Sequence, residues 1–255
     1  MSRSEIVFLS AEWRELLMLN YEVDPAHLEE YVPAGTELDS FGGKTYVSLV
    51  GFRFCGTKLL GTIPIPFHAH FEEINLRLYV RRSTGGQIRR GVVFIAEIVP
   101  RRAIALTARL FYGENYVRRP MAHRRNAKES DLEVQYSWRS RNQWSKLEGH
   151  AAGAPSLPAE GSPEQFITEH YWGYSRQRDG GTVEYHVSHV PWKVWTASPA
   201  HFSGDTRDLY GDKLTQLLAK TPASAFIAEG SPVKVFKGVK LPSTHKARCH
   251  RGPIG

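Results

Sequence analysis

The sequence predicts an α+β protein built mainly of antiparallel β-sheet, and three observations support this fold class. Its 22 glycines, 15 prolines and 11% aromatic residues favour many short strands and turns over a helical bundle. Several segments alternate apolar and polar residues with the period of two that is typical of strands. Turn residues separate these segments, and Asp179-Gly180-Gly181 predicts a hairpin turn between two of them.

Strands are predicted where an alternating or apolar run is bounded by turn residues. Residues 91–99 are nearly all apolar, which is typical of a strand buried on both faces. Pro64 and Pro66 are expected to keep the loop at 56–66 out of any ladder. The predicted strands, in chain order, span residues 45–54, 70–80, 91–99, 132–138, 171–178, 182–190 and 225–239.

Helices are expected in four places. Asp24 and Pro25 supply an N-cap and a first helical position, and Ser162 and Gln165 have the spacing of a capping box. The predicted helices span residues 25–31, 103–112, 163–171 and 208–220.

Length and composition predict one globular domain over residues 1–241, followed by a basic, disordered tail over 242–255. No apolar run of about 18 residues is present, so no membrane span is expected. The apolar cluster at residues 6–9 is followed at once by charges and does not resemble a signal-peptide core. Cys55 and Cys249 make a poor disulfide framework, which favours a reducing, cytoplasmic location.

The net charge of +7 raises the question of a nucleic-acid partner. Part of the positive charge is clustered at residues 118–125 and again at 234–251. Such clusters are more often solvated faces or tails. No helix-turn-helix, zinc-finger or RNA-recognition motif is present, so we expect no specific nucleic-acid binding.

The segment at residues 70–80 is the most informative, because its two faces differ. Ile74, Leu76, Leu78 and Val80 form one apolar row. The other row alternates with it and contains Phe71, Glu73, Asn75, Arg77 and Tyr79. Alternate residues on a strand lie about 7 Å apart, so the polar members form a ladder that one small ligand could span. A solvated polar face is the alternative, but such a face seldom needs the two flanking aromatics.

Other site chemistries find less support in the sequence. On a strand, His186 and His189 point to opposite faces and cannot easily share an ion, so we expect no metal site. No nucleophile elbow and no glycine-rich phosphate loop is present, and no cofactor is predicted. Arg109 sits in an otherwise apolar helical stretch. It either extends its charge to the surface or is held at a pocket to bind a carboxylate.

At this point the residues resemble the YqjF-like family, domain of unknown function 2071, over nearly the whole chain. The run from Phe71 to Val80 is the most specific part of the resemblance. The other matching stretches are Gly91-Val92-x-Phe94, Ala108-Arg109-x-Phe111-Tyr112, Phe166-x-x-Glu169-x-Tyr171 and His189-x-Pro191-Trp192. The resemblance implies the acetoacetate decarboxylase-like superfamily, with an antiparallel β-barrel or cone, a few peripheral helices and an internal cavity.

The resemblance also implies that imine chemistry is missing here. Arg109 and Glu73 match an arginine and a glutamate of the true decarboxylases. Tyr116 stands where those enzymes carry the lysine that forms a Schiff base, and Val117 stands where the second lysine would be. A tyrosine cannot form an imine.

We therefore expect an internal polar cavity that binds or transforms a small organic acid without Schiff-base chemistry. Glu73 would act as acid or base in lyase-like or hydrolase-like chemistry, and Tyr116 would donate a hydrogen bond. The alternatives are a non-catalytic ligand-binding protein and, less favoured, a nucleic-acid-associated protein using residues 118–125. The sequence leaves open whether the chain forms a homo-oligomer. The predicted ligand-binding residues are Asn75, Arg77, Tyr79 and Arg109.

Overall fold

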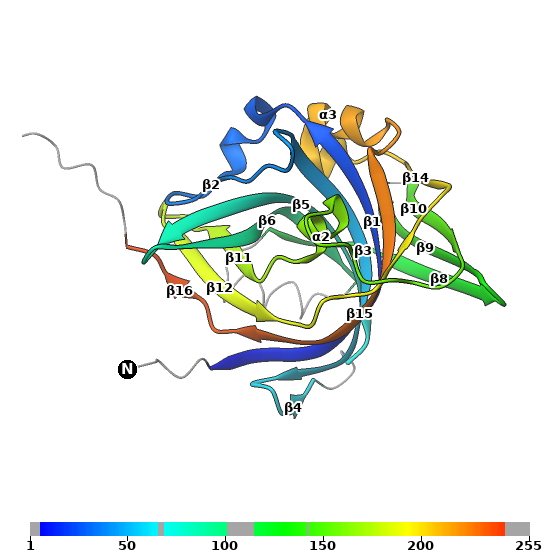
Figure 1. The fold of residues 1–255 in the computed structure, drawn as a ribbon, viewed down its shortest axis with the longest axis horizontal. Coiled ribbons are helices and arrows are strands. Elements are labelled where there is room, and N and C mark those ends of the chain that lie inside the picture. Colours follow the sequence, from blue (N-terminus) through cyan, green and yellow to red (C-terminus); the bar gives the residue numbers. More distant parts are fainter. Residues whose placement is uncertain (1–5, 66–68, 101–114, 142, 243–255) are drawn as a thin grey trace, which may run out of the picture.

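The computed structural model describes residues 6–65, 69–100, 115–141 and 143–242, and most of them lie in strands (Figure 1). The larger sheet is built on nine strands and carries three short ones at its margins. The nine are β1 (Val7–Val23), β3 (Thr45–Leu59), β5 (Phe71–Thr84), β6 (Gln87–Val99), β11 (Trp172–Arg176), β12 (Thr182–Ser188), β13 (Val194–Thr196), β15 (Ser224–Phe236) and β16 (Val239–Lys240). The short ones are β2 (Glu37–Leu38), β4 (Ile63–Pro64) and β7 (Tyr116–Arg118).

The larger sheet curves into a cone. Its neighbours run in the order β15, β1, β3, β5, β6, β11, β12, and β12 then pairs with β15 through Val187↔Val235 and Ser188↔Lys234. The described pairings are antiparallel, except those of β6 with β11 and with β7. The predicted α+β class with mainly antiparallel sheet is therefore confirmed, and the cone form fits the expected architecture.

A second sheet packs on the outside of the cone. Its strands are β8 (Met121–Lys128), β9 (Asp131–Ser140), β10 (Gln143–Ala152) and β14 (Ala200–Ser203), in the order β14, β10, β9, β8. Buried side chains of β9, such as Val134, Tyr136 and Trp138, belong to the same core cluster as the apolar row of β5. This cluster joins the two sheets into one core.

Strand β5 is buried on both faces. Ile74, Leu76 and Leu78 are fully buried in the outer core, while Phe71 and Tyr79 belong to a second cluster inside the cone. We expected helices to cover the apolar row. Helix α3 (Arg207–Leu218) does contribute to the outer core, but the second sheet contributes there as well.

Several predicted boundaries were wrong. Strand β1 was not predicted, although it runs for 17 residues and pairs with both β3 and β15. The loop predicted at residues 56–66 is partly strand. Strand β3 continues to Leu59, and Pro64 on β4 pairs with Lys58 on β3, so Pro64 does not stay out of the ladder. The predicted hairpin at Asp179–Gly181 is present between β11 and β12. The helix predicted at 103–112 and the tail from 243 onward lie outside the described residues.

The described helices are short, and two of them begin at a side-chain cap. Residues 25–31 form two turns of 3-10 helix, Pro25–His27 and Glu29–Tyr31, and the Asp24 carboxylate accepts a hydrogen bond from the Ala26 backbone N–H. Helix α2 (Pro163–Thr168) is shorter than predicted, and its Ser162 cap accepts from the Gln165 N–H at 3.1 Å, as the capping-box spacing predicts. Neither described α-helix is long and apolar enough to cross a membrane.

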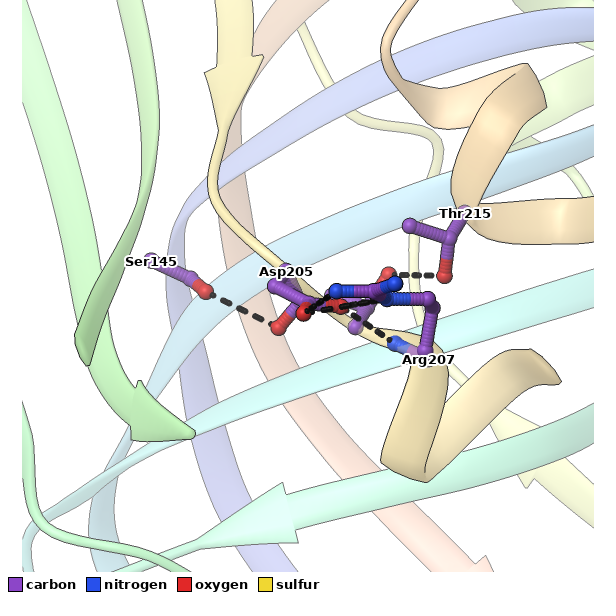
Figure 2. Close-up of polar contacts among 5 residues, drawn as sticks. Ser145, Asp205, Arg207 and Thr215 are labelled. Carbon is purple, nitrogen blue, oxygen red and sulfur yellow. Dashed lines mark hydrogen bonds and ion pairs between the residues drawn. The ribbon is translucent and has the colours of Figure 1, made fainter. Parts of the chain in front are cut away.

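The second sheet is tied to α3 by polar contacts (Figure 2). The Ser145 hydroxyl of β10 donates to the Asp205 carbonyl, and the Asp205 carboxylate binds the Arg207 guanidinium at 2.6 Å. Thr215 lies on α3 and shares a hydrogen bond of 2.9 Å with the hydroxyl of Thr206, the helix cap. These contacts fix the start of α3 against the edge of the second sheet.

The contact between the two sheets leads to a prediction about Gly51 on β3. A Cβ at this position would lie 2.6 Å from the Tyr136 ring and 2.9 Å from Ile74, so Gly51→Ala overfills the outer core. We expect a loss of about 1–3 kcal/mol in unfolding free energy, measured by urea denaturation.

Gly181→Ala is the matched control, because the nearest atom there is the far end of the flexible Lys240 side chain. Equal stability of both variants would contradict the tight packing of the two sheets at Gly51.

Candidate functional site

A cavity of about 160 Å³ lies inside the cone. Most of the side chains that line it are aromatic or aliphatic, with a smaller set of charged and polar groups. The polar lining comes from Thr57, Glu73, Arg77, Glu97, Tyr116, Thr168, His170, Tyr185 and His189. The apolar lining includes Phe8, Leu9, Trp13, Phe54, Leu59, Ile65, Phe71, Val92, Phe94, Trp172, Val187, Trp192 and Val235.

Glu73 is held by hydrogen bonds from two sides. Asn75 Nδ2 donates to one carboxylate oxygen at 3.2 Å, and the Tyr116 hydroxyl donates to the other at 3.2 Å. Glu73 is only 2% exposed. Each of the two carboxyl oxygens therefore accepts a hydrogen bond from a neighbouring side chain, which fixes the orientation of the group.

Glu97 adds a second buried carboxylate to the same wall. It lies opposite Asn75 in the β5–β6 ladder and opposite Tyr116 in the β6–β7 ladder. We had interpreted the strand at 91–99 as apolar and did not select Glu97. The sequence did contain a signal for Glu97, namely a single acidic residue in a strand predicted to be buried. A buried carboxylate requires partners, so such a residue indicates a polar site.

The Arg77 guanidinium is buried and tethered to its surroundings. Its Nη2 donates to the Ile167 carbonyl of α2 at 3.0 Å, and its Nε donates to the Tyr79 hydroxyl at 3.3 Å. These bonds leave Nη1 as a donor that no described residue occupies. The guanidinium is therefore oriented by the protein and still has donor capacity toward the cavity.

Arg77 ends a row of hydrogen bonds that crosses four strands. Ser48 on β3 donates to the Asn20 side-chain oxygen on β1 at 2.6 Å, so Tyr79 must donate to Ser48 at 2.6 Å. Asn20 in turn donates to the Ser224 hydroxyl on β15 at 3.1 Å. Tyr79 thus positions Arg77 and does not line the cavity itself.

His170 is a buried, neutral histidine at the cavity. Burial and the nearby positive charges of Arg77 and Arg90 hold the pKa of His170 well below its ordinary value. Among the described residues, neither ring nitrogen makes a hydrogen bond of normal length and angle, although the nearby Ile167 backbone opposes part of the fall in pKa. Burial also lowers the pKa of His189, which stacks on Trp192 at 4.2 Å.

Two further polar atoms at the cavity lack partners in the described part of the chain. They are Trp13 Nε1 and Thr57 Oγ1, and Thr57 is 1% exposed. Buried polar groups are normally satisfied by protein, water or ligand. Together with His170, these atoms provide donors and acceptors for a bound molecule.

Lysine is missing from the described cavity lining. The segments outside the described residues contain one lysine in the sequence, Lys246. Tyr116, which the resemblance placed at the Schiff-base position, points its hydroxyl at Glu73 instead.

The structure brings Glu73, Arg77 and Tyr116 together around the cavity, with Asn75 and Tyr79 buried beside them. Arg109 lies outside the described residues. The roles assigned to these residues remain predictions. Sequence reasoning missed Glu97 and His170. It predicted opposite directions for His186 and His189, but not that His189 would line the cavity while His186 stacks on Phe236.

Two other sequence hypotheses concern metal ions and the basic segment. Among the described residues, no three His, Cys, Asp or Glu side chains are grouped so that they could hold a metal ion. Part of the basic segment forms ion pairs: Arg119 with Asp208 at 2.9 Å, and Arg125 with Glu15 at 2.9 Å.

The cone, its cavity and its strand order place the molecule in a known structural class. It is similar to acetoacetate decarboxylase from Legionella pneumophila, with a TM-score of 0.64 and 14% identity over 92% of this chain and 87% of that one. An acetoacetate decarboxylase-like enzyme from Sphingomonas wittichii RW1 gives 0.65 and 13% over 92% and 93%. The enduracididine biosynthesis enzyme MppR, complexed with pyruvate, gives 0.63 and 13% over 94% and 92%. The fold is thus acetoacetate decarboxylase-like.

Within this class, the chain belongs to the family DUF2071, described as uncharacterized conserved protein, whose profile matches residues 10–232. It is also 26% identical over 208 residues to Uncharacterized protein YqjF of Bacillus subtilis (strain 168), covering 80% of this chain and 82% of YqjF. The family resemblance stated from the residues is confirmed.

The hydrogen-bonded row leads to a prediction about Tyr79. Tyr79→Phe removes the hydroxyl that joins Ser48 to Arg77 and leaves buried polar groups without partners. We expect the unfolding free energy to fall by about 1–3 kcal/mol, measured by urea denaturation.

Tyr46→Phe is the matched control, because both tyrosine rings contact Phe166 while the Tyr46 hydroxyl binds no residue in the described part of the chain. If the two variants lose the same stability, the Tyr79 hydroxyl does not hold the row together.

The pKa of His170 gives a pH prediction. Because the folded protein holds this pKa below the unfolded value near 6.5, the unfolded chain binds the extra proton first. His170 therefore makes its full contribution to the unfolding free energy above about pH 6.5. Below that pH the contribution is lost, with a slope approaching about 1.4 kcal/mol per pH unit.

His170→Phe should flatten the fall in stability between pH 7 and pH 5, followed by urea denaturation at each pH. His150→Phe serves as control, since the His150 side chain is half exposed. If the unfolding free energy of His170→Phe falls with pH as steeply as that of the native protein, His170 binds its proton equally well in the folded and unfolded states, which would contradict the lowered pKa.

Proposed function

We propose that the protein binds or transforms a small organic acid inside the cone, without Schiff-base chemistry. The observation that carries this proposal is a tethered, buried guanidinium at a mostly apolar cavity whose described lining has no lysine. A guanidinium with free donors binds a carboxylate strongly in such surroundings, because few waters compete for it.

Arg77 is the proposed anchor for the carboxylate. Its Nε and Nη2 are fixed by Tyr79 and Ile167, so less side-chain entropy is lost when a ligand binds Nη1. Arg109 is proposed as a second carboxylate ligand on the basis of the family resemblance.

Glu73 and Tyr116 are the proposed acid–base pair. Their hydrogen bond of 3.2 Å allows a proton to pass between the phenol and the carboxylate, and Asn75 keeps the carboxylate in place. Glu97 lies on the same wall and would add negative charge next to Tyr116. Proton transfer in a lyase-like or hydrolase-like reaction would use this pair.

The similar structures support an acid as ligand without defining it. MppR has been solved as a complex with pyruvate, and it shares the fold with this chain. We therefore propose a small organic acid as the ligand class of this chain, and we do not propose pyruvate itself as the ligand.

A non-catalytic binding protein is the second candidate, and one observation favours it. Glu73 already accepts hydrogen bonds from Asn75 and Tyr116. Polar groups that satisfy one another in this way can shape a binding site without taking part in a reaction.

The experiment compares the metabolites that co-purify with the protein and with two arginine variants, read by mass spectrometry. We expect an organic acid with the native protein and with Arg81→Gln, and much less of it with Arg77→Gln. Arg81 lies on the same strand and is partly exposed beside Glu37, so it controls for loss of one positive charge. Co-purification of only neutral or cationic compounds, or equal recovery with Arg77→Gln, would refute the proposal.

The absence of imine chemistry is tested by borohydride trapping. After treatment with pyruvate or acetoacetate and borohydride, intact mass spectrometry should show the unmodified mass, because Tyr116 cannot form an imine. A keto-acid-dependent mass increase on any lysine would mean that another amine has taken this role.

A further inference from the structure

We infer that the ligand carries one aromatic ring in addition to its acid group. This inference rests on the proposed function and adds to it the class of acid. It is drawn from the size of the cavity and from the two unlike walls that face each other across it.

The size of the cavity matches a single ring. Its volume is about 160 Å³. An engineered protein cavity of about 150 Å³ binds benzene. An acid as small as acetate would leave most of this space empty, and an acid with two fused rings is larger than the benzene that a cavity of this size binds.

The two walls of the cavity differ in chemistry. The closed order of strands places β12 and β15 farthest around the sheet from β5. Val187 and Val235 from these strands line the cavity with aliphatic side chains, and Tyr185 adds an aromatic ring that carries a hydroxyl. This mostly apolar wall faces Glu73 and Arg77 across the cavity. A ligand that satisfies both walls has a polar head at β5 and an apolar body at β12.

The apolar wall is rigid. The Tyr185 ring lies directly on Gly173, where a Cβ would come within 2.1 Å of it. Beside this wall, the Trp13 ring packs edge to face against two other rings. The distance between ring centroids is 6.1 Å to Trp192 and 5.8 Å to Phe54. Such fixed aromatic surfaces bind another ring well, because little side-chain freedom is lost on binding.

The test is calorimetric titration of the full-length protein with four probes. They are phenylacetate, acetate, 2-phenylacetamide and 1-naphthylacetate. We expect phenylacetate to bind at least tenfold more tightly than acetate, which corresponds to about 1.4 kcal/mol. Phenylacetate should also bind more tightly than the uncharged amide and than the two-ring acid.

A substitution at the apolar wall tests whether the ring of the ligand binds there. Val187→Phe fills this side of the cavity and should weaken phenylacetate at least tenfold while leaving acetate unchanged. Val239→Phe is the control, because Val239 is 52% exposed and does not line the cavity. If Val187→Phe fails to fold, the comparison of the four probes on the native protein decides alone.

The contrary outcomes separate this inference from the proposed function. Equal binding of acetate and phenylacetate would refute the aromatic ring and keep the organic-acid site. Equal binding of phenylacetate and 2-phenylacetamide would refute the acid group and keep the aromatic ring. No binding of any probe overturns both.

Discussion

The site depends on a row of buried hydrogen bonds that runs from Arg77 through Tyr79, Ser48 and Asn20 to Ser224. Arg77 and Tyr79 lie on β5, and the other three members lie on the successive strands β3, β1 and β15. The strand registers place these residues side by side. A buried polar group without a partner costs about 1–3 kcal/mol, so none of the four strands can slip without leaving several groups unsatisfied. The row therefore fixes the register of the strands and the direction of the guanidinium together.

The unlike faces of β5 explain why the cavity lies inside the cone. The apolar face must be covered, and the second sheet and α3 cover it from outside. The polar face must then point inward, where its groups bind one another and no described residue accepts from Arg77 Nη1. Closure of the sheet by the β12–β15 pairing brings an apolar wall opposite this face. A polar wall opposite an apolar wall follows from burying an amphipathic strand within a closed sheet.

Much of this arrangement could be predicted from the sequence where local patterns are regular. The period of two at residues 70–80 gave the two faces of β5, and Ser162 with Gln165 gave the start of α2. Strand β1 could not be predicted in this way. Glu15 has a φ of +58° and marks a bulge at which the register with β3 shifts, so the alternation changes phase in mid-strand. Directly after it, Leu16 to Leu19 are all buried because both faces of β1 are covered, which removes the alternation altogether.

The parts of the site that sequence reasoning missed depend on long-range pairing. Glu97 reaches the site because β6 pairs with β5 and β7, and His170 reaches it because the segment after α2 lies against Tyr79 and Phe166. His170 has no local pattern that distinguishes it from an ordinary residue, and Glu97 has only its acidic side chain in an otherwise apolar strand. Position in the closed sheet, which a single sequence does not display, makes them part of the cavity.

The central claim is that Arg77 holds a carboxylate in a cavity that forms no imine. A crystal structure of the protein saturated with pyruvate tests it most directly. The account predicts the carboxylate within about 3 Å of the Arg77 guanidinium, with the keto carbon bonded to no lysine. A carboxylate held away from Arg77, or electron density continuous from the keto carbon to a lysine Nζ, would contradict it.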